Sequence, residues 1–169
     1  MSHVLLRTPL AARPLRAYLV VGSLMLAVLA LLGGCSAPSD PPGAIGLRNP
    51  TAPVASQANA ALARLEGRWI VVEGAGVLPG QSVEIRGNVL TMGSQTYLLE
   101  DQGAGRFSTG SESLWVHWLD IDARTAAIGD PGGGRVWIMD RTGRPAERLR
   151  AAHEILDWYG YDLDRMQRL

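Results

Sequence analysis

The segment LWVHWLDIDARTAAIGDPGGGRVWIMD, residues 114–140, contains three short apolar runs separated by turn-forming residues. The runs cover residues 114–121, 125–129 and 135–140, and the intervals between them are Asp-Ala-Arg at 122–124 and Asp-Pro-Gly-Gly-Gly at 130–134. Short β-rich runs bounded by such residues are typical of antiparallel strands joined by tight turns. The segment therefore predicts an all-β body rather than strands alternating with helices.

The same pattern extends from this segment toward the N-terminus. Five further strands are expected there, at residues 68–73, 82–86, 89–92, 95–100 and 106–109. Eight short strands with turns between them are typical of a small all-β barrel or sandwich. After the last strand, Pro145 and Gly160 bracket an amphipathic segment, so a helix is expected over residues 145–159. Its apolar face is expected to pack on the outside of the β body.

The first 34 residues have the organisation of an export signal. Arginines and no acidic residue precede an apolar run over residues 18–32, which is short for a membrane span. The run ends in Leu-Gly-Gly-Cys at 32–35, which resembles the lipobox of bacterial lipoproteins, and Cys35 is the only cysteine. We therefore expect residues 1–34 to be a lipoprotein signal peptide and Cys35 to carry a diacylglyceryl group and further acyl chains such as palmitate. The alternative is a short uncleaved anchor.

The next segment, residues 35–58, is rich in Pro, Ala, Ser and Gly and predicts a flexible tether after the lipidated Cys35. The folded domain is then expected over residues 59–169. Ser36 follows the cysteine, and the resemblance to bacterial lipoproteins implies anchoring in the outer membrane, facing the periplasm. The expected setting is therefore the bacterial cell envelope, with the domain bound to a membrane through its N-terminal lipid.

The composition argues against several classes of function. The chain has no lysine, which excludes Schiff-base and P-loop chemistry. Its 16 basic and 16 acidic residues cancel, which removes the electrostatic case for nucleic acid. One cysteine and three histidines leave little for a metal site. No nucleophile or acid–base constellation is evident, and His117 between two tryptophans is typical of a packed histidine. We expect no enzyme activity, no cofactor and no metal.

Motifs at both ends of the β region resemble those of the lipocalin family. Gly67-Arg68-Trp69 is similar to the G-x-W of the first lipocalin strand, and VWIMDR at 136–141 is similar to the last strand, which ends in an arginine. The helix and the GYDL at 160–163 resemble the end of bacterial lipocalins. The resemblance implies a small eight-stranded antiparallel up-and-down barrel, with a partly open barrel as the alternative. It also implies that Arg141 stacks on Trp69 and closes one end, where Gly67 allows close approach.

The resemblance further implies a lumen that binds a small hydrophobic ligand of the fatty acid or lysophospholipid class. Candidate lining residues are Val71, Glu73, Tyr97, Trp115, His117 and Trp118. Trp115 and His117 share one face of their strand and Trp118 lies on the other, so which face is inward stays open. The alternative is a barrel filled by its own side chains, which acts as a protein-interaction module at the envelope, such as an inhibitor or an assembly accessory.

Overall fold

The computed structural model describes residues 46–169. The predicted signal peptide over residues 1–34 and the predicted lipidation of Cys35 lie outside the described residues. Within residues 46–169, no helix has the length and apolar character needed to cross a membrane.

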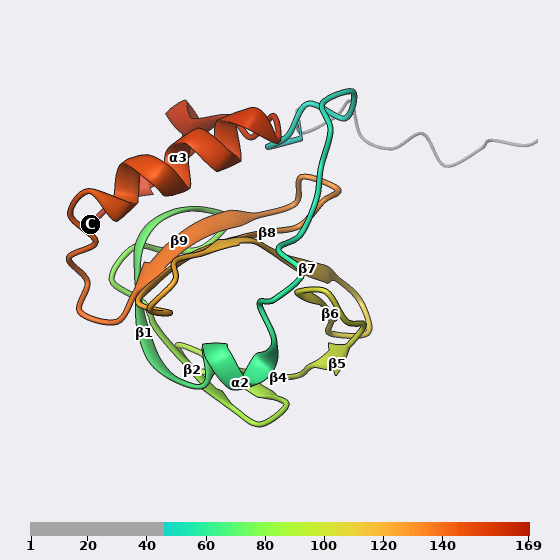
Figure 1. Cartoon of the computed structure of the whole chain (residues 1–169), viewed down its shortest axis with the longest axis vertical. Helices are drawn as coiled ribbons and strands as arrows, with labels where there is room; N and C mark the ends of the chain where they lie inside the picture. The colour runs from blue at the N-terminus through green and yellow to red at the C-terminus, as the bar shows by residue number, and fades with distance from the viewer. Residues whose placement is uncertain (1–45) are drawn as a thin grey trace, which may run out of the picture. The chain divides into compact units, whose positions relative to one another are not determined.

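The described chain forms an antiparallel sheet that curls into a nearly closed barrel (Figure 1). Its elements are α2 (Leu62–Leu65), β1 (Gly67–Ala75), β2 (Ser82–Arg86), β3 (Val89–Met92), β4 (Gln95–Leu98), β5 (Glu100–Asp101), β6 (Arg106–Ser108), β7 (Ser113–Leu119), β8 (Thr125–Gly129), β9 (Val136–Asp140), α3 (Arg148–Trp158), the 3-10 helix η1 (Leu163–Arg165) and β10 (Gln167–Arg168). Neighbouring strands follow the order β4-β3-β2-β1-β9-β8-β7-β6-β5, and β10 pairs with β1.

The strand count differs from the eight expected. Nine strands follow one another around the sheet, because the run at 95–100 divides at Leu99 into β4 and β5, and β10 is an additional tenth strand. Strands β4 and β5 are the two edges of the sheet, and within the described part of the chain no ladder joins them. The barrel is therefore held together by hydrogen bonds around its circumference except at this seam.

Strand β9, which lies beneath helix α3, is buried on both faces. Along β9, Trp137 and Met139 pack inside the barrel, whereas Val136 and Ile138 pack outside it. The outer cluster lies beneath α3, which covers this side of the barrel through buried residues such as Leu156 (Figure 1). Burial on both faces explains why this strand is apolar throughout rather than alternating.

Helix α3 begins at Arg148, later than the expected start at Pro145. Ala146 has a φ of 52°, in the left-handed region, so residues 145–147 form a turn that cannot belong to a right-handed helix. The helix ends before Gly160, whose φ of 80° suits the residue that terminates a helix. The predicted helix is thus confirmed in its position and shortened at its N-terminus.

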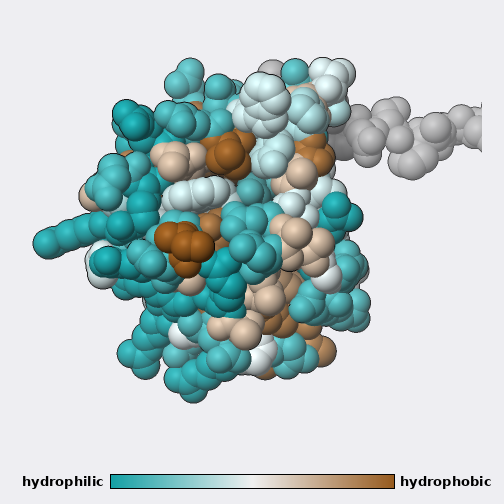
Figure 2. Space-filling model, in the orientation of Figure 1, coloured by the Kyte–Doolittle hydropathy of each residue, from teal (hydrophilic) through white to brown (hydrophobic). Residues whose placement is uncertain are grey.

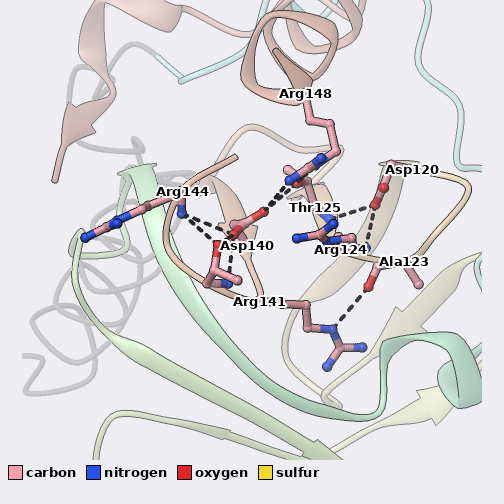
Figure 3. A network of polar contacts seen from close by, with 9 residues as sticks. Asp120, Ala123, Arg124, Thr125, Asp140, Arg141, Arg144 and Arg148 are labelled. Carbon is pink, nitrogen blue, oxygen red and sulfur yellow. Dashed lines mark hydrogen bonds and ion pairs between the residues drawn. The ribbon is translucent and has the colours of Figure 1, made fainter. Parts of the chain in front are cut away.

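Asp140 links β9 to β8 and to the segment that leads into α3 (Figure 3). Its side chain is fully buried, and the Thr125 hydroxyl donates to Oδ2 at 2.6 Å. Arg148 Nη2 lies 3.8 Å from the same oxygen. The backbone N–H groups of Thr142 and Arg144 donate to Oδ1 at 2.8 and 3.1 Å. Burial raises the pKa of Asp140, but these hydrogen bonds outweigh it, and the pKa lies below its ordinary value.

Replacing Thr125 with valine is expected to lower the free energy of unfolding by about 2 kcal/mol, because the buried carboxylate of Asp140 loses a donor while the shape of the side chain is kept. Urea denaturation at pH 7 measures the change. Thr96→Val on the exposed edge strand β4 is the control, and its effect should stay within about 0.5 kcal/mol. Equal stability of Thr125→Val and the wild type would contradict the role given to Asp140.

Residues 46–58 pack against the barrel, although their composition predicts a tether. Leu47 is buried, and its N–H donates to Gly133 O at 2.9 Å. The Gln57 N–H donates to Val116 O at 2.7 Å, and its side chain bonds both backbone groups of Leu119. The predicted tether is therefore wrong for residues 46–58, because these residues bind the backbone of β7 and of the β8–β9 turn.

Candidate functional site

Trp69 and Arg141 close one end of the barrel, here called the Trp69 end. The guanidinium carbon of Arg141 lies 3.5 Å from the centroid of the Trp69 ring. Arg141 Nη1 donates to Glu66 O at 2.6 Å, and its Nε donates to Ala123 O at 3.1 Å (Figure 3). Trp69 Nε1 donates to Leu65 O at 2.7 Å. The hydrogen bonds of both side chains in this stack go to backbone carbonyls, so the end is rigidly sealed.

Gly67 provides the space that this stack needs. Its φ of 97° lies in the region that favours glycine, and a Cβ at this position would lie 3.0 Å from Arg141 Nη1. Any larger residue would therefore strain the backbone and push the guanidinium away from Trp69. The structure brings together all three residues that the sequence singled out for this end.

The lumen above Trp69 is lined by hydrophobic side chains. They are Leu65, Val83, Ile85, Leu90, Leu99, Phe107, Leu114, Ile128, Trp137 and Met139. The cavity left between them has a volume of about 20 Å³, close to the space of a single water molecule. A void of this kind stays dry because it offers a water no set of hydrogen-bond partners. Small barrels either are filled by side chains or hold one ligand, and this lumen is close to filled.

Arg135 covers the opposite end, here called the Arg135 end, where β1 finishes and β9 starts. Its guanidinium carbon lies 5.6 Å from the ring centroid of Tyr97 on β4 and 5.6 Å from that of Trp137 on β9. Its Nη2 forms an ion pair with the carboxylate of Glu112, from the β6–β7 turn. Trp137 lines the lumen, so Arg135 contacts one of the lining side chains from this end of the barrel.

Three buried polar groups associated with the Arg135 end have no hydrogen-bond partner. They are Arg135 Nε, Thr109 Oγ1 and Trp137 Nε1. In the described part of the chain one other such group occurs, Arg48 Nε, which belongs to the N-terminal segment outside the barrel. Buried polar groups are almost always hydrogen-bonded, so a set of three at one end of a lumen calls for an explanation.

Strand β1 does not keep the alternation that the sequence suggested. Val71 packs inside the barrel, and Tyr97 lies partly buried against the same interior cluster. A β-bulge between Val71 and Glu73 shifts the register of β1 against β9. Glu73 consequently faces outward, where His153 Nε2 of α3 lies 2.7 Å from its Oε2 and Arg168 Nε lies 3.2 Å from its Oε1. The prediction that Glu73 lines the lumen is wrong.

A second β-bulge, between Val116 and Trp118, shifts the register of β7 against β8. Val116 and Leu119 are inside, whereas Trp118 packs in the outer cluster near α3. Trp115 lies outside as well, with the Arg106 guanidinium carbon 4.5 Å from its ring centroid. Neither of the two faces expected from strict alternation is therefore the inward one. The predictions that Trp115, His117 and Trp118 line the lumen are wrong.

His117 is a buried histidine on the outer face of the barrel, 3% exposed. Its Nδ1 donates to Ala55 O at 2.7 Å. The hydroxyl of Tyr161 lies 2.8 Å from Nε2 and 2.8 Å from Asp130 O, and its one proton can be donated to either. Burial lowers the pKa of His117 to about 4; the bond to Ala55 opposes this shift and the charge of Arg48 adds to it. His117 is thus neutral at pH 7 and joins the N-terminal segment to β7 and to the chain after α3.

The Glu73–His153 pair is a further contact between titratable side chains on the outer face. Glu73 is 4% exposed, and the pair lies in a groove formed with Pro145, Leu149 and Arg168. His153 of α3 is therefore bonded to the barrel. Among residues 46–169, no group of three or more His, Cys, Asp or Glu side chains is arranged to hold a metal ion.

No protein-family model and no curated protein matches the sequence. Solved structures do match the fold. The crystal structure of the major allergen Per a 4 from cockroaches aligns with a TM-score of 0.51 and 11% identity, covering 72% of this chain and 95% of that chain. The fold is lipocalin-like. The solution structure of lipocalin 12 from rat epididymis has a TM-score of 0.45 and 11% identity, covering 75% of this chain and 93% of that chain.

Proposed function

We propose that the protein binds a small hydrophobic molecule of the fatty acid or lysophospholipid class in the lumen of the barrel. The observation that carries the proposal is a wholly hydrophobic lumen that ends at three unpartnered buried donors. Burial of apolar ligand surface there would supply about 25 cal/mol per Å², less the cost of ordering the ligand. No chemical step is involved, so the protein acts as a binder or carrier and not as an enzyme.

The small volume of the cavity means that a chain can enter only if the lining side chains move apart. The seam between β4 and β5 provides the means, because no ladder joins these edges in the described structure. Leu99 and Phe107 line the lumen beside this seam, on the linker and on β6. Strands β4 and β5 are continuous through Leu99, so their edges can part only away from this residue, where no backbone hydrogen bonds between them would be lost.

We further infer that the protein works at the bacterial cell envelope, attached to the outer membrane through Cys35 and facing the periplasm. The support is in the sequence: arginines before an apolar run, then Leu-Gly-Gly-Cys at 32–35 and Ser36. Several acyl chains on one cysteine bind a membrane stably, whereas a single chain does so only marginally. Such an anchor would place the lumen close to a source of fatty acids.

A titration of the full chain with a fluorescent fatty acid, competed with oleate, tests binding in the lumen. Leu99→Trp places an indole in the lumen and is expected to weaken binding about tenfold or more. Leu98→Trp is the matched control, because the neighbouring Leu98 is 62% exposed and its variant should bind within about twofold of the wild type. Equal weakening in both variants, or no saturable binding by the wild type, would overturn the proposal.

The second candidate function is a filled barrel that binds a protein partner, and the cavity of about 20 Å³ is the observation that favours it. Exposed hydrophobic residues for such a contact exist, notably Ile121 (86% exposed) and Trp158 (71% exposed). On the face shown in Figure 2, however, hydrophobic residues form small patches in a mostly hydrophilic surface. A protein-binding surface usually has a larger continuous apolar patch, so ligand binding is the better supported function.

A further inference from the structure

We propose that the Arg135 end of the barrel is a carboxylate site, in which Arg135, Thr109 and Trp137 bind the head group of the lumen ligand. The inference deepens the proposed function and rests on it, since the head group is bound only if the chain occupies the lumen. It assigns the ligand a chemical class, a long-chain carboxylic acid, and a direction. The carboxylate lies at the Arg135 end, and the hydrocarbon tail points toward Trp69.

The hydrogen-bonding capacity of the three unpartnered groups identifies their missing partner. Arg135 Nε and Trp137 Nε1 can only donate a hydrogen bond, and the Thr109 hydroxyl can donate one as well. Two of the three groups can only donate and the third is able to donate, so the set is complementary to a group that only accepts. An ionised carboxylate is such a group, with two oxygens and about four lone-pair positions. An alcohol or an amide would bring donors of its own and match the set less well.

Strand geometry brings these groups to the mouth of the lumen. Arg135 immediately precedes β9 and lies two residues before Trp137, whose side chain lines the lumen. Thr109 follows β6 and lies two residues after Phe107, which also lines the lumen. The turn that begins at Thr109 is closed by its N–H bond to Glu112 O at 3.0 Å, and Glu112 is the residue that pairs with Arg135.

The charges at the Arg135 end would allow a ligand carboxylate to replace the Glu112 carboxylate on Arg135. The Arg135 side chain is only 11% exposed, so its positive charge is largely removed from water and requires an anion close by. Glu112 fills that role in the structure described, but its side chain is 45% exposed. A ligand carboxylate could replace Glu112 on the guanidinium, and Glu112 would return to solvent with little loss because its charge is already well hydrated.

The position of Arg135 joins this head-group site to the lumen. The guanidinium lies 5.6 Å from the rings of both Tyr97 and Trp137, on strands that belong to different parts of the barrel wall. If a ligand carboxylate is bound to Arg135, the hydrocarbon chain attached to it would therefore enter the lumen beside Trp137. The opposite end offers no such site, because the Arg141 guanidinium is stacked on Trp69 and donates to backbone carbonyls. One charged end and one sealed end fix the direction of the ligand.

The test compares two probes that share a hydrocarbon chain and differ in the head group, oleate and oleyl alcohol, at pH 8. Arg135→Gln in the full chain is expected to weaken oleate binding about tenfold or more and to change oleyl alcohol binding by less than about threefold. Arg68→Gln is the control, because Arg68 also pairs with a glutamate, Glu84, but its side chain is 79% exposed and lies at the start of β1, near the Trp69 end. That control should leave both affinities unchanged.

Glu112→Gln provides a second variant that does not depend on the fold tolerating the loss of Arg135. Removal of the competing carboxylate is expected to strengthen oleate binding several-fold and to leave oleyl alcohol binding unchanged. If Arg135→Gln weakens both probes equally, or if Glu112→Gln has no effect on oleate, the carboxylate site is overturned while ligand binding in the lumen stands. If the wild type binds neither probe, the proposed function fails and the head-group site fails with it.

Discussion

Replacing Trp69 with alanine is expected to lower the free energy of unfolding by about 3–5 kcal/mol, the usual cost of deleting a buried aromatic side chain. The side chain is 1% exposed, receives the Arg141 guanidinium on its face and donates to Leu65 O. Its loss opens a cavity and leaves the guanidinium without its aromatic partner. Since small domains are stable by about 5–15 kcal/mol, the variant should lose much of its stability. Urea denaturation followed by circular dichroism measures the change.

Trp158→Ala is the matched control for this substitution. Trp158 is 71% exposed at the end of α3, so removal of the same side chain there should change stability by less than about 1 kcal/mol. A Trp69→Ala protein that unfolds at the same urea concentration as Trp158→Ala would show that the Trp69 end does not hold the barrel together.

Acidification from pH 7 to pH 4 is expected to destabilise the protein through His117 by about 3 kcal/mol, taking an unfolded pKa of about 6.5 and a folded pKa of about 4. The folded pKa is the lower one, so the unfolded state binds more protons between these values. The contribution is therefore fully present above about pH 6.5 and is lost as the pH falls toward 4. Urea denaturation at pH 7, 6, 5 and 4 measures it.

His117→Gln is the control, since it removes the titrating ring and should flatten the dependence over this range. The opposite dependence of stability on pH would contradict a neutral His117. If the wild type becomes more stable on acidification and the variant does not, the folded state prefers a protonated His117. In that case Nε2 donates to the Tyr161 hydroxyl and completes the chain of bonds from Ala55 to Asp130.

The general architecture was predictable from sequence because turn residues and apolar runs are local signals. The β-barrel with one C-terminal helix is confirmed, and the fold is lipocalin-like. The pairing of Gly67, Trp69 and Arg141 followed from motifs at the two ends of the β region, and the structure places these residues together. The strand count was less predictable, because a division as small as that at Leu99 leaves no mark in an apolar run.

The lumen-facing residues were mostly not predictable, for a physical reason. A β-bulge reverses which side chains face inward, and neither the bulge after Val71 nor that after Val116 has a sequence signature. The predicted tether failed over residues 46–58 because an extended segment of small residues can bind a strand through backbone groups that composition does not reveal. Arg135 could have been found from its alternation with Trp137, since no bulge intervenes between them.

Uptake of a hydrophobic ligand by the lumen can be observed by native mass spectrometry of the full chain, purified in detergent from a bacterial host. We expect the wild type and Leu98→Trp to carry one molecule of a long-chain carboxylic acid and Leu99→Trp to carry none. Lipid held on the outer surface would appear equally in all three. Identical masses for the three proteins, with no bound acid in any, would contradict the claim and favour the filled barrel.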